Sequence, residues 1–355
     1  MSLSTKRHTI PMVITSRSIP QAKSIVFDEK LWIINDELKS RNAQGENESW
    51  QSRVSVFDPE LEVFTEMNCT PDVFSSELQF LAANETDLYM WRAKWDANVR
   101  KYDYSLYKLS RATLEWECIL TVDGFRSWKS VVIINQIMYV LERMDDSTYF
   151  LITINLPEGK IVEMEPLFLK SENEYLTSHN NTLYLITIIR NYRKVFEIKN
   201  GELIDVAQRE LVGLRELLIF PEPVHCADSN ECVAYLHKNG HNIFEIQTFD
   251  FGSLEWESEN IRPDWLKGVG VRVKSVVKMK GFIYTLVWKP KERLLELNVL
   301  DLHPKLTSIC LADLANRLSE EKDEQKLEDA KKHLPIPMRV KLDELLKWKE
   351  EACEE

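Results

Sequence analysis

The feature that most constrains this chain is a pattern of paired apolar stretches that occurs six times between residues 22 and 311. Each repeat has an apolar stretch, a tight polar turn and a second apolar stretch, then a variable loop and another such pair. The anchors of the second pairs recur every 44 to 52 residues, at Phe57-Asp58, Leu109-Ser110, Ile154-Asn155, Ile198-Lys199, Phe249-Asp250 and Leu300-Asp301. Two hairpins per repeat at such a period indicate a β-propeller, in which each repeat forms one four-stranded blade.

We therefore predict an all-β fold, a six-bladed β-propeller with a C-terminal α-helical extension. The propeller spans 8–311, and 8–16 is a possible ring-closing strand that joins the blade built by the opposite terminus. Stretches such as 183–189 are apolar throughout, as expected of strands that neighbouring blades bury on both faces. The extension, 312–355, is charged and lacks Gly and Pro as far as residue 332, which favours helix.

Composition narrows the class of protein. The net charge of −12 argues against a general nucleic-acid binder, although a local basic face is compatible with it. No apolar run approaches the length of a membrane-spanning helix, and the N-terminus lacks the pattern of a signal peptide. The six cysteines contain no CxxC pair, so we expect reduced thiols in a cytoplasmic protein, with a nuclear location as the alternative.

The second hairpin of several repeats resembles the kelch motif, which has a Tyr-Asp pair and a Trp seven residues after the Tyr. The same spacing of seven separates Phe57 from Phe64, Leu109 from Trp116, and Phe249 from Trp256. The Gly-Gly pair of kelch repeats is missing, and the chain has only ten glycines, so the resemblance is to a divergent kelch-repeat propeller. That resemblance implies protein binding, and kelch propellers often serve as substrate receptors.

No motif predicts an enzyme, a cofactor or a bound metal. The chain has no Gly-rich phosphate loop, no GxSxG and no HExxH. The closest set of metal-ligating types lies in the fifth repeat, as His225, Cys226, Cys232, His237 and His241. Its residues fall on different sides of a hairpin turn, so we predict no metal site there. Because no catalytic or phosphate-binding motif occurs, we also predict no catalytic residues and no cofactor.

The long loops between hairpins carry many basic and aromatic residues and would lie on one face of the propeller. Because Arg and Trp dominate protein interfaces, we predict a non-enzymatic interaction scaffold or adaptor that binds a protein, possibly an acidic or phosphorylated peptide, through this face. The alternatives are RNA binding through the same face, or a ubiquitin-ligase substrate receptor recruited through the C-terminal tail. We expect neither a membrane nor a small-molecule partner. The candidate partner-binding residues are Arg92, Trp95, Arg100, Arg126, Trp128, Arg143, Arg190, Arg193, Trp265, Arg272 and Lys289.

The tail is predicted to be a second contact element, which either braces the propeller or binds a partner. Its apolar residues are spaced for one face of a helix. They are Leu314, Leu318, Leu342, Leu345 and Trp348.

Overall fold

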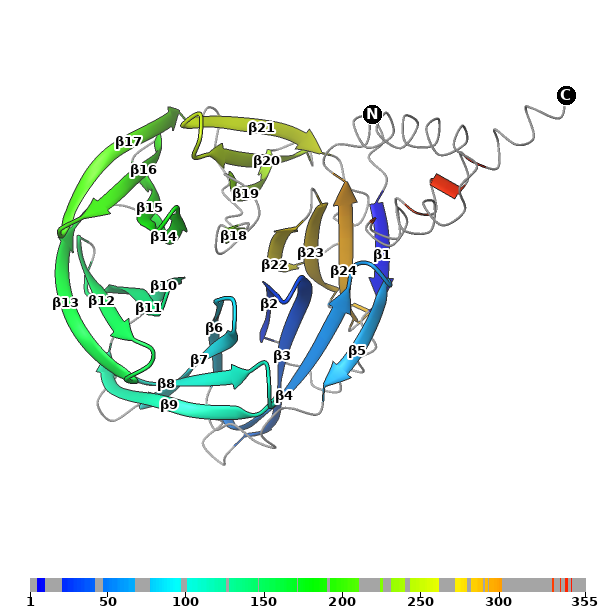
Figure 1. The fold of residues 1–355 in the computed structure, drawn as a ribbon, viewed down its shortest axis with the longest axis horizontal. Helices are drawn as coiled ribbons and strands as arrows, with labels where there is room; N and C mark the ends of the chain where they lie inside the picture. The colour runs from blue at the N-terminus through cyan, green and yellow to red at the C-terminus, as the bar shows by residue number, and fades with distance from the viewer. Residues whose placement is uncertain are drawn as a thin grey trace, which may run out of the picture.

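A computed structural model of the chain shows an all-β propeller, whose four-stranded sheets are arranged around a common centre (Figure 1). The structure describes residues 5–9, 21–41, 47–67, 77–96, 101–125, 128–145, 147–170, 172–189, 192–210, 224–225, 231–239, 243–261, 272–279, 282–289, 291–292 and 294–301, and residues 334, 339, 342, 343 and 346 of the tail.

Five blades are each built from four consecutive strands, ordered from the centre of the ring outward. Blade 1 has β2 (Gln21–Phe27), β3 (Lys30–Arg41), β4 (Asn47–Asp58) and β5 (Val63–Met67). Blade 2 has β6 (Glu77–Ala83), β7 (Asp87–Asp96), β8 (Lys101–Ser110) and β9 (Trp116–Phe125). Blade 3 has β10 (Trp128–Ile134), β11 (Ile137–Arg143), β12 (Thr148–Asn155) and β13 (Lys160–Phe168). Blade 4 has β14 (Glu172–His179), β15 (Thr182–Ile189), β16 (Tyr192–Lys199) and β17 (Glu202–Glu210). Blade 5 has β18 (Val224–His225), β19 (Glu231–Asn239), β20 (Ile243–Asp250) and β21 (Glu255–Ile261).

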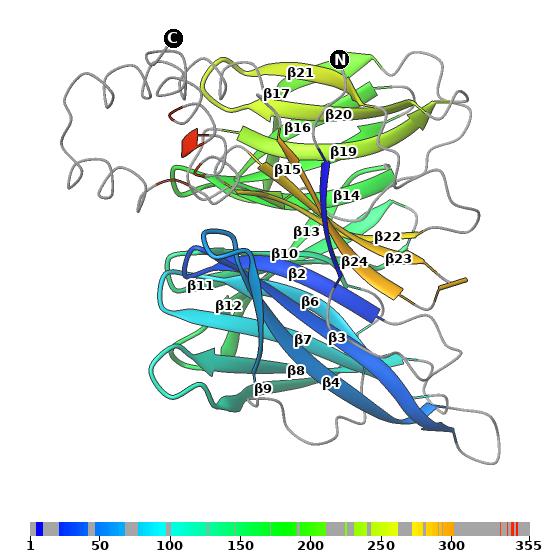
Figure 2. The ribbon, with the colours of Figure 1, turned by 90° about the vertical axis from the view of Figure 1, so that its right-hand side faces the viewer.

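The remaining sheet joins the two ends of the chain, and we call it the closing sheet. It contains β22 (Arg272–Met279), β23 (Phe282–Lys289) and β24 (Leu294–Asp301), with β1 (Thr5–Thr9) as its outermost strand. Strand β1 pairs antiparallel with β24, from Thr5 opposite Leu300 to Thr9 opposite Glu296 (Figure 2). The inner strand β2 contacts both β6 and β22, so blade 1 packs against blade 2 on one side and the closing sheet on the other.

The predicted fold class needs two corrections. The sequence predicts six repeats of two complete hairpins each, but five blades are built from consecutive strands; among the described residues the last repeat contributes three strands and the N-terminus supplies the fourth. The predicted C-terminal α-helical extension is also wrong for the described residues, whose elements are all strands. In the tail, the described residues Arg339, Leu342, Asp343 and Leu346 have helical backbone. Charge and spacing alone are a weak determinant of helix, because most helical stability comes from packing.

Apolar side chains fill the interfaces between neighbouring sheets. One buried cluster joins Leu31, Ile33 and Phe57 of blade 1 to Leu295 and Leu297 of the closing sheet. Similar clusters join blades 1 and 2, 2 and 3, 3 and 4, and 4 and 5. The sheets of blades 1 to 4 are therefore buried on both faces, which explains why their strands have few polar positions.

The sequence anchors are turn-forming residues at the ends of the third strands. The Asp58 carboxylate accepts hydrogen bonds from the backbone N–H groups of Glu60 and Leu61, at 2.9 and 3.1 Å. The side chains of Ser110, Asn155 and Asp250 accept backbone N–H groups in the same way. These polar anchors thus satisfy backbone donors where the chain reverses.

The spacing of seven residues in the kelch-like motif is a cross-strand pair. Phe57 lies opposite Phe64, Leu109 opposite Trp116, and Phe249 opposite Trp256. The rings of the first pair have centroids 4.9 Å apart, and those of the last 5.0 Å. Aromatic pairs on directly opposed positions stabilise antiparallel strands, so the spacing follows from the turn length between them.

Four residues after the anchor, these turns require a left-handed backbone. The φ angle is +53° at Glu62, +57° at Leu114 and +59° at Leu254, whereas blade 3 has glycine there, Gly159, also at +59°. A side chain in this region strains the backbone, and only glycine adopts it freely. The scarcity of glycine in this chain therefore leaves strain in the turns.

Leu254→Gly and Gly159→Ala occupy equivalent positions, and we predict opposite effects on stability. Leu254→Gly should raise the free energy of unfolding by about 0.5–1 kcal/mol, because it relieves the strained φ angle. Gly159→Ala should lower it by more than about 1 kcal/mol, because a Cβ there would lie 2.5 Å from the Ile119 carbonyl oxygen. Urea unfolding of both variants measures the two changes, and changes of the same sign would contradict this account.

The turn at Asp58 also predicts a dependence of stability on pH. Partial burial alone would raise the pKa of this carboxyl, but hydrogen bonds from Lys30, Leu61 and Glu60 outweigh it and lower the pKa below its usual value. The stabilisation is therefore complete above about pH 3.8 and is lost as the pH falls through the lowered pKa. The difference in unfolding free energy between wild type and Asp58→Asn should shrink below about that pH. A difference that stays constant down to pH values well below it would refute the assignment.

Candidate functional site

Buried polar side chains are placed between neighbouring sheets, near the start of the inner strands. Ser24 and Ser275 form a hydrogen bond of 2.9 Å between β2 and β22. The Ser130 hydroxyl on β10 accepts the backbone N–H of Leu176 on β14 at 2.9 Å. Such contacts bring polar side chains from distant parts of the sequence together inside an apolar propeller. They are therefore candidate positions for a catalytic or binding site.

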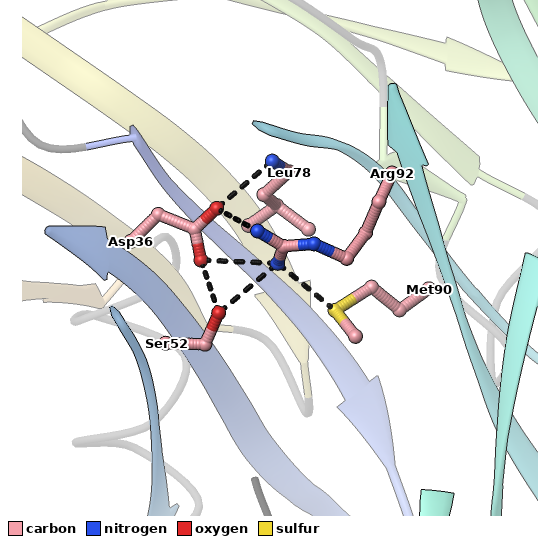
Figure 3. A network of polar contacts seen from close by, with 5 residues as sticks. All are labelled: Asp36, Ser52, Leu78, Met90 and Arg92. Atoms are coloured by element: carbon pink, nitrogen blue, oxygen red, sulfur yellow. Dashed lines mark hydrogen bonds and ion pairs between the residues drawn. The ribbon is translucent and has the colours of Figure 1, made fainter. Parts of the chain in front are cut away.

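The largest of these networks joins blades 1 and 2 around Arg92 on β7 (Figure 3). Its guanidinium donates to both oxygens of Asp36 on β3, at 2.8 and 3.2 Å. It also donates to the Ser52 hydroxyl at 3.0 Å, and Ser52 in turn donates to Asp36 at 2.6 Å. The second Asp36 oxygen accepts the backbone N–H of Leu78 at 2.9 Å, as Figure 3 shows.

The Arg92 network is closed. Both side chains of the ion pair are 0 % exposed, and both carboxylate oxygens of Asp36 already accept two hydrogen bonds. A bidentate pair with its lone pairs occupied has no capacity left for a ligand. We therefore assign Arg92 to the joining of blades 1 and 2 rather than to ligand binding.

A second network, between blades 3 and 4, contains groups capable of proton transfer. The hydroxyl of Tyr149 on β12 donates to the carboxylate of Glu174 on β14 at 2.5 Å, and both side chains are buried. A phenol in hydrogen-bond contact with a carboxylate is the arrangement by which a base activates a nucleophile or orients an acid.

Positive charge lies beside this pair. Lys129 on β10 is half-buried, and its pKa is lowered from the usual value by burial and then by Arg143, while Glu174 opposes the shift. Arg143 on β11 is partly exposed, and its Nε donates to the backbone oxygen of Asp145 at 3.0 Å. Unlike Arg92, these two cations reach the surface, so an anion from solution can approach them.

The structure does not gather the predicted partner-binding residues into one exposed face. Arg92, Trp128 and Arg193 are buried, and the Arg193 guanidinium lies 5.4 Å from the ring of Trp256 in blade 5. Of the predicted residues whose side chains are described, Lys289 and Arg143 are partly exposed, and Lys289 is paired with Glu296. Arg100, Arg126, Arg190 and Trp265 lie outside the described residues, as do the side chains of Trp95 and Arg272.

Most of the predicted tail contacts also lie outside the described residues, namely Leu314, Leu318, Leu345 and Trp348. Leu342 is completely buried. Nearby in the chain, Arg339 lies 3.7 Å from Glu60, in the turn that follows β4. This part of the tail therefore contacts blade 1, although the distance is long for an ion pair.

Sequence reasoning missed Asp36, Tyr149 and Glu174. Their only sequence signal is a polar residue near the end of an otherwise apolar strand, and neighbouring strands carry many such residues. Their partners lie 25 to 56 residues away and depend on how the blades pack.

Among the described residues, no group of three or more His, Cys, Asp and Glu side chains could hold a metal ion. His225 of the suggested metal set lies opposite Cys232 in the β18–β19 ladder, while Cys226 and His241 are outside the described part. In the same described part, no helix is long and apolar enough to cross a membrane.

Comparison with known proteins identifies the fold. No protein-family model matches the sequence, and no curated protein matches it. A sialidase from Trypanosoma rangeli in complex with sialic acid has a similar structure, with a TM-score of 0.52 and 10 % identity over 91 % of this chain and 62 % of the sialidase. An acylaminoacyl peptidase from Pyrococcus horikoshii matches with a TM-score of 0.43 and 9 % identity over 78 % of this chain and 44 % of the peptidase. The chain thus spans less than two thirds of either protein. The chain is a β-propeller.

These comparisons correct the predicted function. The sialidase shows that this fold occurs in an enzyme, so the prediction that the protein is not an enzyme does not stand. The predicted non-enzymatic scaffold, with its RNA-binding and ubiquitin-ligase alternatives, fails for the same reason, because it rested on the absence of recognisable catalytic motifs in the sequence. Identity near 10 % shows the fold alone, so any activity has to be argued from this chain's own residues.

The closed Arg92 network predicts a test by mutation. Arg92→Met should lower the free energy of unfolding by about 3–5 kcal/mol, because Asp36 would remain buried and uncompensated. Asp36→Asn combined with Arg92→Met should lose less, since the amide needs no counter-charge and still accepts from Leu78 and Ser52. Lys30→Met, which breaks a more exposed pair, is the matched control and should lose less than about 1 kcal/mol. Urea unfolding measures all three, and an equal loss in the single and double variants would argue against an ion-pair function.

Proposed function

We propose that the propeller binds a small carboxylate-bearing ligand at the inner ends of blades 3 and 4, and that Tyr149 and Glu174 transfer a proton to or from it. The observation that carries the proposal is the hydrogen bond of 2.5 Å between the Tyr149 hydroxyl and the Glu174 carboxylate. This contact brings a potential nucleophile or acid together with a base that can deprotonate it.

The surrounding charges support an acidic ligand. Lys129 and Arg143 are near enough to each other for Arg143 to lower the pKa of Lys129, and a carboxylate between them would relieve that repulsion. Arginine binds carboxylates through its planar fork, while lysine acts as a compact charge. The sialidase structure is a complex with sialic acid, so a propeller of this fold can hold an acidic ligand.

The proposed reaction follows from the order in which the cations, Tyr149 and Glu174 would meet the ligand. The carboxylate of the ligand would bind at Lys129 and Arg143, which leaves the rest of the ligand facing Tyr149. In one course, Glu174 would take the phenolic proton as the Tyr149 oxygen bonds to a carbon of the ligand, and the bond from that carbon to its leaving group would break with the electron pair going to the leaving group. In the other, Tyr149 would donate its proton to the leaving group while Glu174 keeps the phenol oriented.

Two earlier predictions remain proposals beside this one. We infer that the repeats are divergent kelch repeats, a view supported by the cross-strand aromatic pairs and the anchored turns. An acidic peptide as partner also stays a prediction, because four of the basic or aromatic loop residues on which it rests lie outside the described part of the chain.

The test has a binding step and a catalytic step. Wild-type protein should bind small acidic sugars or acylated amino acids in calorimetry, and Lys129→Gln should weaken binding at least about tenfold by removing one charge. Binding should also weaken at alkaline pH, because Lys129 with its lowered pKa loses its proton before an ordinary lysine does.

The catalytic step is tested with chromogenic acidic glycosides and esters. Tyr149→Phe and Glu174→Gln should each abolish turnover while binding is retained, and Tyr192→Phe, on an exposed tyrosine of blade 4, should leave it unchanged. Binding without turnover in wild type would reduce the proposal to ligand recognition. Absence of binding to any carboxylated compound would overturn it.

A further inference from the structure

The closing sheet contains buried polar atoms that make no hydrogen bond to the protein. Asn298 on β24 is 1 % exposed, and both its amide nitrogen and its amide oxygen lack a partner. Glu296, two residues earlier, is 5 % exposed; one carboxylate oxygen bonds Lys289 at 2.7 Å, and the other has no partner. Buried amide and carboxylate atoms are nearly always satisfied by protein or by bound molecules, so this group requires an explanation.

The strand register places these side chains on one face. Asn298 lies opposite Thr285, and Glu296 lies opposite Val287 on β23. Residues two apart in a strand point to the same side, so Glu296, Asn298 and the buried Thr285 share a face of the closing sheet. Leu295 and Leu297 on the other face pack against blade 1. The polar face is therefore the one directed toward blade 5, which is the next sheet around the ring in Figure 1.

We propose that this face of the closing sheet is a binding site for a hydroxyl-bearing molecule, either water or a small polyol. The Asn298 nitrogen requires an acceptor, while the Asn298 oxygen and the Glu296 oxygen require donors. A hydroxyl group both donates and accepts, so one or two of them satisfy all three atoms.

A metal cation fits this group less well. Lys289 already neutralises Glu296, and the Asn298 nitrogen would repel a cation. An anion fits no better, because it only accepts hydrogen bonds, whereas the Asn298 and Glu296 oxygens require donors.

The site is linked to closure of the ring. Strand β1 pairs with the same stretch of β24, with Arg7 opposite Asn298 and Thr9 opposite Glu296. A molecule held by Asn298 and Glu296 would thus bind the sheet that joins the two termini. Because the folded sheet binds it and the unfolded chain does not, its occupancy stabilises the closed ring.

The decisive variant is Asn298→Leu, compared with wild type in thermal unfolding of the full chain. If a hydroxyl is bound, leucine displaces it and leaves Glu296 unsatisfied, so the melting temperature should fall by about 3 °C or more. If the amide is unsatisfied and dry, leucine removes an unfavourable group and the melting temperature should rise, which would overturn the proposal. Thr187→Val, on a buried threonine of blade 4, controls for the general effect of removing a polar group from a blade interface.

A crystal structure of the full chain, purified without polyols, provides the second measurement. Electron density within hydrogen-bond distance of both Asn298 and Glu296 supports the site; isolated peaks identify water, and continuous density identifies a polyol retained during purification. No density there, or a side chain of blade 5 bonded to both residues, would refute it. Because blades 3 and 4 are not involved, this result is independent of the proposed proton-transfer function.

Discussion

The structure depends on one constraint, which is that a ring of sheets has to close. A blade buries both faces only if it has a neighbour on each side, and the first and last sheets have no such neighbour along the sequence. Pairing of β1 with β24 ties the N-terminus to the last sheet, and Leu295 and Leu297 of that sheet pack against blade 1. The apolar face that Leu31, Ile33 and Phe57 form would be exposed to water without the closing sheet that covers it.

Closure also determines where polar groups are tolerated. Inside the ring the blades bury each other, so a polar side chain has to find its partner on the next blade. Asp36 and Arg92 do this with every carboxylate lone pair occupied, and the pair therefore acts as a fixed contact between blades 1 and 2. Tyr149 and Glu174 use the same interface geometry between blades 3 and 4, but they adjoin the half-buried Lys129 and the partly exposed Arg143. The difference between a structural contact and a candidate reactive site thus lies in access to solvent rather than in the residue types.

The turns show how a glycine-poor sequence builds a fold that other propellers build with glycine. Asp58, Ser110, Asn155 and Asp250 satisfy backbone donors at the chain reversals, and the residue four positions later is left-handed. Only blade 3 has glycine at that place, so the other turns hold their shape because the flanking strands are paired. Local strain is tolerated here because the paired strands on both sides over-determine the turn.

The sequence by itself determined the repeat, the strand-rich class and the anchors, because these depend on contacts within about ten residues. The alternation of apolar stretches and polar turns specifies hairpins, and the spacing of seven from Phe249 specifies its partner Trp256. What only the tertiary structure decided is the register in which the N-terminal strand completes the last sheet and which polar residues meet. The pairing of Arg7 with Asn298 joins residues at opposite ends of the chain, and Arg92 finds Asp36 across 56 residues. The sequence favoured Arg92 as a surface contact because it placed this residue in a long loop, whereas β7 extends to Asp96 and includes it. Arg92 is buried because Asp36 of the neighbouring blade compensates the charge of its guanidinium. No local sequence pattern encodes this pairing.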